Sequence, residues 1–125
     1  MTPLSGYRWK IYGEFCMNKN LLESVAMGIK AYVDIIGQIR LSYSGRSMEP
    51  TIPSKAEICV EKFCKISPGN IYVFYFVFPM GPAQLVCHRL IYELNGKCYF
   101  RGDNRSHVEV VDESNIIGHV RSWSE

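Results

Sequence analysis

The chain has 125 residues, of which 47% are hydrophobic and 21% charged, a composition that excludes disordered and fibrous proteins. Its length fits one domain with a core of its own. Fourteen basic residues against 12 acidic ones give a net charge of +2 without any run of lysine or arginine. The electrostatic footprint of a nucleic-acid-binding protein is therefore missing, and we expect no nucleic-acid partner.

Cysteine usage and apolar runs indicate the compartment. Five cysteines at irregular spacing do not suggest a disulfide framework, which favours a reducing environment. The N-terminus lacks the uninterrupted apolar segment of a secretory signal. The longest apolar run, residues 71–78, is much shorter than the roughly 20 residues that span a bilayer. We expect a cytoplasmic protein without a transmembrane anchor, and the sequence does not indicate its oligomeric state.

The first 40 residues predict an arm followed by a helix. Residues 1–19 have no sustained period and stay unassigned. From residue 21 to residue 40, apolar side chains recur at helical spacing, as the following positions show: Leu22, Val25, Ile29, Val33, Ile36 and Ile39. Charges of both signs on the other face favour a helix that packs on the domain over one that lies on a membrane. We expect residues 1–40 to join a β domain of residues 41–125 in one compact unit.

The rest of the chain has the pattern of strands. Alternating or continuous β-branched and aromatic residues predict strands over 56–63, 71–78, 84–93, 97–101 and 115–123. Turns are expected at 67–70 and 79–82, and Asn95-Gly96 is a strong hairpin signal. No β-α-β alternation or internal repeat is present. The predicted fold is mainly β, an antiparallel sheet or partly open barrel preceded by one amphipathic helix.

The segment from Gly45 to Ile52 holds a serine, Ser47, in a glycine-led and proline-closed stretch between the helix and the strands. Such a stretch can present a nucleophile outside regular structure, although a serine there is also common in ordinary turns. A nucleophilic serine needs a base. Of the three histidines (His88, His107 and His119), His88 is predicted mid-strand, where a side chain is aimed most accurately. An unperturbed imidazole, with a pKa of about 6.5, is mostly neutral at pH 7 and can accept a proton.

A third group usually orients the imidazole of such a pair. Asp103 follows the hairpin's second strand, and Glu109 and Asp112 come further along. Asp103 can equally serve as a turn residue that caps the strand end. The residues themselves leave both uses of Asp103 open.

Five blocks in order carry a resemblance to a known family. They are residues 45–52, 68–74, 88–91, 102–104 and 116–120, which read GRSMEPTI, PGNIYVF, HRLI, GDN and IIGHV. Together they resemble the signal peptidase and LexA-like serine peptidases over residues 41–121. The resemblance implies the fold of that family and identifies Ser47 as the nucleophile. The His-Arg pair at 88–89 resembles the endoplasmic-reticulum type, which implies His88 as the base.

The chain departs from this family in three places. Signal peptidases have a membrane anchor before the serine block, whereas this chain has the amphipathic segment 21–40, which favours a cytoplasmic peptide or protein as substrate. Many relatives have an oxyanion-binding serine where this chain has Gly45. The oxyanion and substrate site is then expected to use Gly45, Arg46, Ser47 and Met48, with the Ser47 backbone N–H and a neighbouring donor. Glu109 lies near the place of a further family aspartate, so the orienting acid is Asp103 or Glu109.

The sequence thus predicts a serine endopeptidase that needs no cofactor and no metal. Its substrate, for example a leader or precursor peptide, would add as a strand beside residues 41–45 or 83–87. One alternative is a non-catalytic regulatory or protein-binding module on a LexA-like scaffold. The weakest alternative is a metal or redox site drawn from the following residues: Cys59, Cys64, Cys87, His88 and Cys98.

Overall fold

The computed structural model describes residues 9–12, 19–78 and 83–124, which form one α-helix, a short 3-10 helix and eight strands. The helix α1 covers Lys19–Ile36 and the 3-10 helix covers Glu113–Asn115. The strands are β1 (Trp9–Tyr12), β2 (Gln38–Ser44), β3 (Glu57–Glu61), β4 (Ile71–Val77), β5 (Ala83–Leu94), β6 (Lys97–Arg101), β7 (Glu109–Asp112) and β8 (Ile116–Ser124). The turn expected at 79–82 lies outside the described residues.

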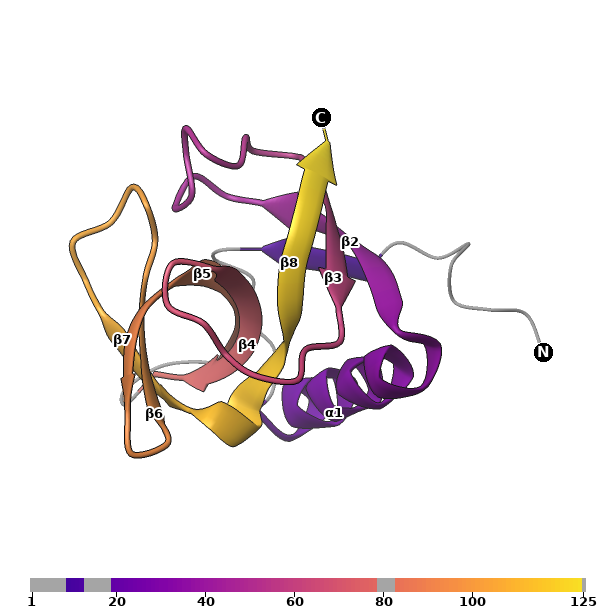
Figure 1. The fold of residues 1–125 in the computed structure, drawn as a ribbon. Coiled ribbons are helices and arrows are strands. Elements are labelled where there is room, and N and C mark those ends of the chain that lie inside the picture. The colour runs from indigo at the N-terminus through magenta and orange to yellow at the C-terminus, as the bar shows by residue number, and fades with distance from the viewer. Residues whose placement is uncertain (1–8, 13–18, 79–82, 125) are drawn as a thin grey trace.

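The strands form one sheet with the order β1-β2-β3-β8-β4-β5-β6-β7. The seven strands from β2 to β8 pair antiparallel, and β1 adds parallel to β2 at one edge. Figure 1 shows that the sheet is strongly curved and that α1 packs beside it. The predicted mainly β fold, with an antiparallel open sheet after one helix, is confirmed.

Helix α1 buries one face against the sheet, as its spacing predicts. Leu22, Ala26, Ile29 and Val33 are all buried in a core shared with β2 to β5 and β8. The expected extent to residue 40 is wrong, because α1 ends at Ile36. The next residue, Gly37, has a φ of 102° and donates its N–H to the Val33 carbonyl at 2.8 Å, an arrangement typical of a helix C-terminus.

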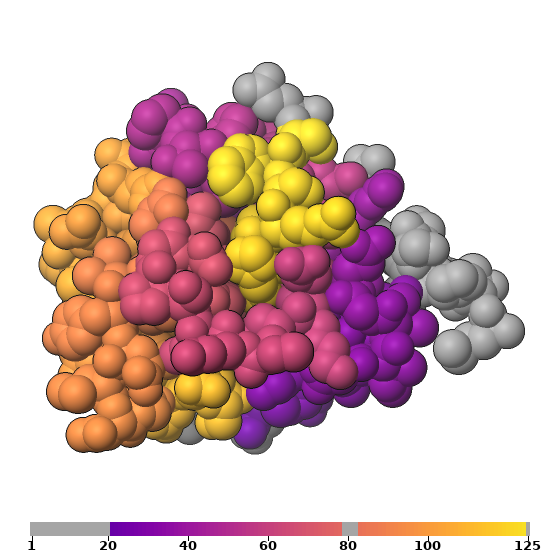
Figure 2. All heavy atoms as spheres, in the orientation of Figure 1, coloured from indigo at the N-terminus to yellow at the C-terminus, as the bar shows by residue number. Residues whose placement is uncertain are grey.

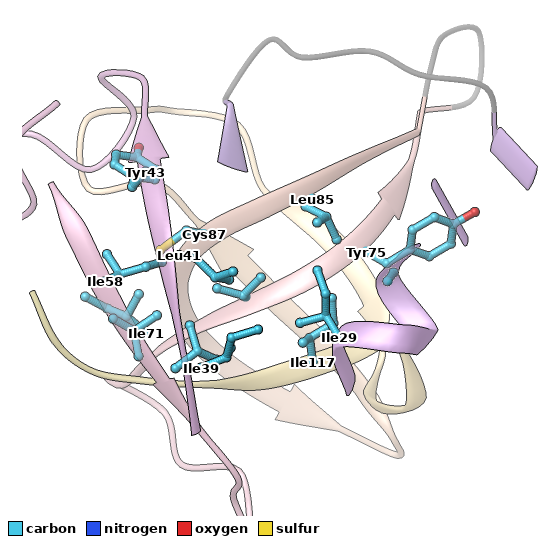
Figure 3. Close-up of a cluster of buried hydrophobic side chains, with 14 of the residues drawn as sticks. Ile29, Ile39, Leu41, Tyr43, Ile58, Ile71, Tyr75, Leu85, Cys87 and Ile117 are labelled. Carbon is cyan, nitrogen blue, oxygen red and sulfur yellow. The ribbon is translucent and has the colours of Figure 1, made fainter. Parts of the chain in front are cut away.

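Strand β4 separates two apolar clusters, which explains its almost unbroken apolar sequence. Val73 and Tyr75 belong to the core that includes α1, whereas Tyr72 and Phe74 belong to a second cluster with Phe100. Figure 3 shows side chains of the first cluster, with Tyr43 at one end and Tyr75 at the other. The expected strand with two buried faces is confirmed.

Strand β1 was not predicted from the sequence, and neither were β2 and β7. Trp9 lies opposite Leu41, and Tyr12 lies opposite Ser44. Strand β1 also contacts β5. Strand β1 therefore lies beside both of the strands that lead to the predicted serine and histidine.

Candidate functional site

The Ser47 segment is a compact turn that begins where β2 ends. Gly45 has a φ of 134°, a conformation that side chains disfavour, so a glycine is needed there. Within the turn, the Ile52 N–H donates to the Met48 carbonyl at 2.9 Å. Met48 and Ile52 are fully buried, and Arg46 is exposed beside Glu49, at 3.2 Å between Nε and Oε1. Buried apolar side chains thus anchor the turn on the core.

A second segment, residues 102–104, fastens this turn from the other side. The Asn104 N–H donates to the Ser47 carbonyl at 2.8 Å, and Asn104 Nδ2 donates to the Arg46 carbonyl at 3.1 Å. The Asp103 N–H lies 3.4 Å from the Met48 sulfur. In Figure 2 the magenta segment after β2 meets the orange segment near the upper left of the molecule. The Gly-Asp-Asn block thus contacts the Gly-Arg-Ser-Met block directly.

The Ser47 backbone and the His88 ring both lie close to Gly102. A Cβ atom at position 102 would lie 2.7 Å from the Ser47 carbonyl oxygen and 2.9 Å from His88 Nε2. Both distances are too short for a real Cβ. Residue 102 must therefore be glycine for the Ser47 turn and the His88 ring to approach each other as they do.

His88 lies on β5 opposite Tyr72 and is 7% exposed. Its Nδ1 atom is 2.5 Å from Glu109 Oε1 on β7, and both side chains are almost buried. The pairing of Phe100 on β6 with Glu109 brings this carboxylate within reach of β5. A neutral imidazole that donates its Nδ1 proton to Glu109 keeps Nε2 as an acceptor, and Nε2 and the Ser47 carbonyl oxygen are both among the atoms that a Cβ at Gly102 would meet.

Asp103 has different partners, so the expectation that it orients His88 is not met. Its carboxylate accepts two hydrogen bonds from Arg89, at 2.9 and 2.8 Å, and one from Thr51 Oγ1 at 2.5 Å. The Arg89 hydrogen bonds hold the pKa of Asp103 below its ordinary value, with a further contribution from Thr51. Asp103 therefore ties the Ser47 turn to β5, and Glu109 is the acid on His88.

The hydroxyl of Ser47 bonds to a residue that the sequence analysis missed. Ser47 Oγ lies 2.9 Å from the hydroxyl of Tyr43. Among the described residues, this is the one hydrogen bond that Oγ forms. One signal could have found Tyr43. It follows Ile39 and Leu41 on the inward face of a strand that ends just before Ser47, and a buried tyrosine hydroxyl usually has a partner.

The other histidines lie away from this site. His119 on β8 pairs with Glu61 on β3, at 3.1 Å between Nδ1 and Oε1, and no serine hydroxyl bonds to either in the described chain. His107 is exposed in the segment between β6 and β7. Of the three histidines, His88 is the one whose ring approaches Gly102 and the Ser47 turn.

The proposed cysteine and histidine metal site has no geometric basis. Across residues 9–12, 19–78 and 83–124, no three His, Cys, Asp or Glu side chains gather as a metal site would require. Burial raises the pKa of Cys87 to about 12 and that of Cys98 to about 11, so both thiols stay protonated at neutral pH. These two cysteines are packing residues of the two apolar clusters.

Comparison with known proteins adds no family assignment. No family model matches the chain, and no curated protein is similar to it in sequence. Within the described residues, no helix combines the length and the apolar character needed to cross a bilayer.

Proposed function

We propose that the chain is a serine endopeptidase of the signal peptidase and LexA-like type, with Ser47 as the nucleophile and His88 as the general base. The observation that carries the proposal is that the two ring nitrogens of His88 have different neighbours. Nδ1 is bound to the carboxylate of Glu109, whose side chain is 12% exposed, and Nε2 lies beside Gly102, against which the Ser47 turn also packs. A serine, an imidazole and a carboxylate in this arrangement are the parts of an acyl-transfer site.

The reaction follows from these roles. His88 Nε2 takes the hydroxyl proton as Ser47 Oγ bonds to a peptide carbonyl carbon, and Glu109 stabilises the imidazolium that forms. The imidazolium then gives its proton to the leaving amine. Water, deprotonated by His88 in turn, releases the acyl group from Ser47. No cofactor takes part in these steps.

An extended peptide or protein segment is the proposed substrate. Residues 41–44 and 83–87 belong to β2 and β5, which lead to Ser47 and carry His88. A peptide strand beside them would present its carbonyl groups to the Ser47 turn. A leader or precursor peptide in the cytoplasm remains the class of substrate that we propose.

The test is covalent labelling by a fluorophosphonate probe, which reacts with activated serines. We expect the wild-type protein to be labelled and Ser47→Ala to be unlabelled. Ser44→Ala, three residues earlier at the end of β2, serves as the matched control and should be labelled like the wild type. Mass spectrometry of the adduct should place the label on Ser47. An unlabelled wild type, or equal labelling of Ser47→Ala, would contradict the proposal.

One observation favours a second function, a non-catalytic peptide-binding module on the same scaffold. Ser47 Oγ is hydrogen-bonded to Tyr43 and not to His88. If this bond reflects a purely structural serine, the protein will not react with the probe in any variant. Catalytic hydrogen bonds are often formed only once substrate is bound, so we rank this function second.

A further inference from the structure

Tyr43 is the hydrogen-bond partner of the proposed nucleophile. Its hydroxyl lies 2.9 Å from Ser47 Oγ, and its side chain is 1% exposed. It belongs to β2 and precedes Ser47 by four residues. No role in the chemistry described so far uses this hydroxyl.

The phenol is held in place from several directions. Its ring is part of the apolar cluster that includes Leu41 and Met48. The Tyr43 N–H donates to the Ala56 carbonyl at 2.8 Å, which fixes the backbone at the point where β2 leads into the Ser47 turn. A side chain restrained in this way loses little entropy when it forms a further hydrogen bond, and such preorganised donors stabilise transition states well.

The phenol also keeps its proton at neutral pH. Burial raises the pKa of Tyr43 above its ordinary value of 10, although the Ser47 hydroxyl and the Met48 backbone act in the opposite direction. Tyr43 can therefore donate a hydrogen bond to Oγ. When it does so, the Ser47 proton is left for another acceptor, such as His88 Nε2.

The site needs a donor at this point. Acyl transfer places negative charge on an oxygen that is bound to the same carbon as Oγ, so the charge develops close to Oγ. Position 45 is a glycine and offers no side-chain donor. The Ser47 N–H has no backbone acceptor within the described residues and supplies one donor. The Tyr43 hydroxyl, 2.9 Å from Ser47 Oγ, is a side-chain donor next to this position.

We propose that Tyr43 is a catalytic residue that supplies this second oxyanion donor, an inference that rests on the proposed peptidase function. In the free protein its O–H donates to Ser47 Oγ. When Oγ bonds to the carbonyl carbon and its proton moves to His88, the carbonyl π electrons move onto the oxygen, and the Tyr43 hydrogen bond shifts to that oxyanion. No proton leaves Tyr43. The bond returns to Oγ when the acyl group is released.

Tyr43→Phe removes the hydroxyl and keeps the ring in the core. We measure inactivation by the fluorophosphonate probe, whose phosphoryl oxygen occupies the oxyanion position, and separate the maximal rate from the half-saturating concentration. Loss of one oxyanion donor should lower the maximal rate by about 10²–10³-fold. The half-saturating concentration should stay unchanged, because the donor acts on the transition state and not on probe binding.

Tyr75→Phe is the matched control. Tyr75 lies in the same apolar cluster, and its buried hydroxyl has no hydrogen-bond partner in the described residues. This variant should react at the wild-type rate. Equal loss in both variants would show that core packing, and not the Tyr43 hydroxyl, sets the rate, and would overturn the proposal.

The outcomes separate this inference from the proposed function. A wild type that does not react overturns both, whereas Ser47-dependent labelling that is as fast in Tyr43→Phe as in wild type overturns the role of Tyr43 alone. A faster Tyr43→Phe variant would mean that the phenol restrains the nucleophile, which also overturns it. If Tyr43→Phe does not fold, 3-fluorotyrosine at position 43 keeps the hydroxyl and should keep the rate, and a 100-fold loss there would contradict the proposal.

Discussion

Two histidine–glutamate pairs join strands of the same sheet, and they differ in burial and in the groups that surround them. His88 and Glu109 lie 2.5 Å apart, with side chains 9% and 12% exposed. His119 and Glu61 lie 3.1 Å apart, with side chains 25% and 33% exposed. The first pair lies beside the Ser47 turn, whereas the second packs against Tyr72, with ring centroids 5.5 Å apart. An imidazole paired with a carboxylate therefore does not by itself indicate the proposed site, and the neighbouring Ser47 turn distinguishes the first pair from the second.

The largest expected difference between the pairs comes from removing each histidine. His88→Ala should lower the rate of fluorophosphonate labelling by about 10⁴-fold, the upper range for a general base. His119→Ala should leave the rate of the folded protein unchanged, because no serine hydroxyl bonds to it in the described chain. The labelling rate and the thermal midpoint of each variant are measured together. A similar loss of rate in both variants would mean that the two pairs are equivalent.

The acids should differ less than the histidines. Glu109→Gln should lower the labelling rate by about 10²-fold, since the neutral amide no longer stabilises the imidazolium although its oxygen can still accept from Nδ1. Glu61→Gln should not change the rate. Asp103→Asn is a further comparison, because the Asp103 carboxylate bonds Arg89 and Thr51 and not His88. A loss in Asp103→Asn that matches Glu109→Gln, in a folded protein, would contradict the assignment of the acid.

The smallest effect on the chemistry is expected from a pair of glycines, one near each histidine. At Gly118 a Cβ would lie 2.5 Å from Val60 Cγ1 and 2.9 Å from the Glu61 carbonyl oxygen. Alanine at Gly102 or Gly118 should therefore lower the free energy of unfolding by about 1–3 kcal/mol through overpacking. Gly102→Ala should in addition slow labelling by roughly 10-fold or more, because it displaces His88 or the Ser47 turn. Urea unfolding and labelling of the folded fraction distinguish the two effects.

The sequence predicted most of the fold because its strands carry strong local signals. The hairpin at Asn95 and Gly96 formed where expected, with positive φ at both residues, and β6 has the predicted bounds. Strand β2 was missed because Ile36 and Ile39 continue the helical spacing of α1. Gly37 ends the helix between them, after which the inward positions alternate as strand positions do.

The site was predicted less completely because parts of it depend on register. Asp103 and Glu109 are both acidic and follow the same hairpin, and only the pairing of β6 with β7 places Glu109 near His88. Arg89, the residue after His88, points to the other side of β5 and donates a hydrogen bond to the Asp103 carboxylate. Tyr43 was overlooked because its role depends on one contact with Ser47 Oγ, which no local pattern encodes.

Strand β1 has a consequence for how any peptide reaches this site. It already pairs with residues 41–44 of β2 and contacts β5, so an extended peptide that uses the same backbone groups must first displace it. Because β1 belongs to the same chain, its effective concentration is far above that of a peptide in solution. The apparent affinity for such a peptide is its intrinsic affinity multiplied by the fraction of molecules in which β1 has left the sheet, so a small fraction means weak binding. For the proposed extended substrate, residues 9–12 would thus be a competitor at this edge of the sheet.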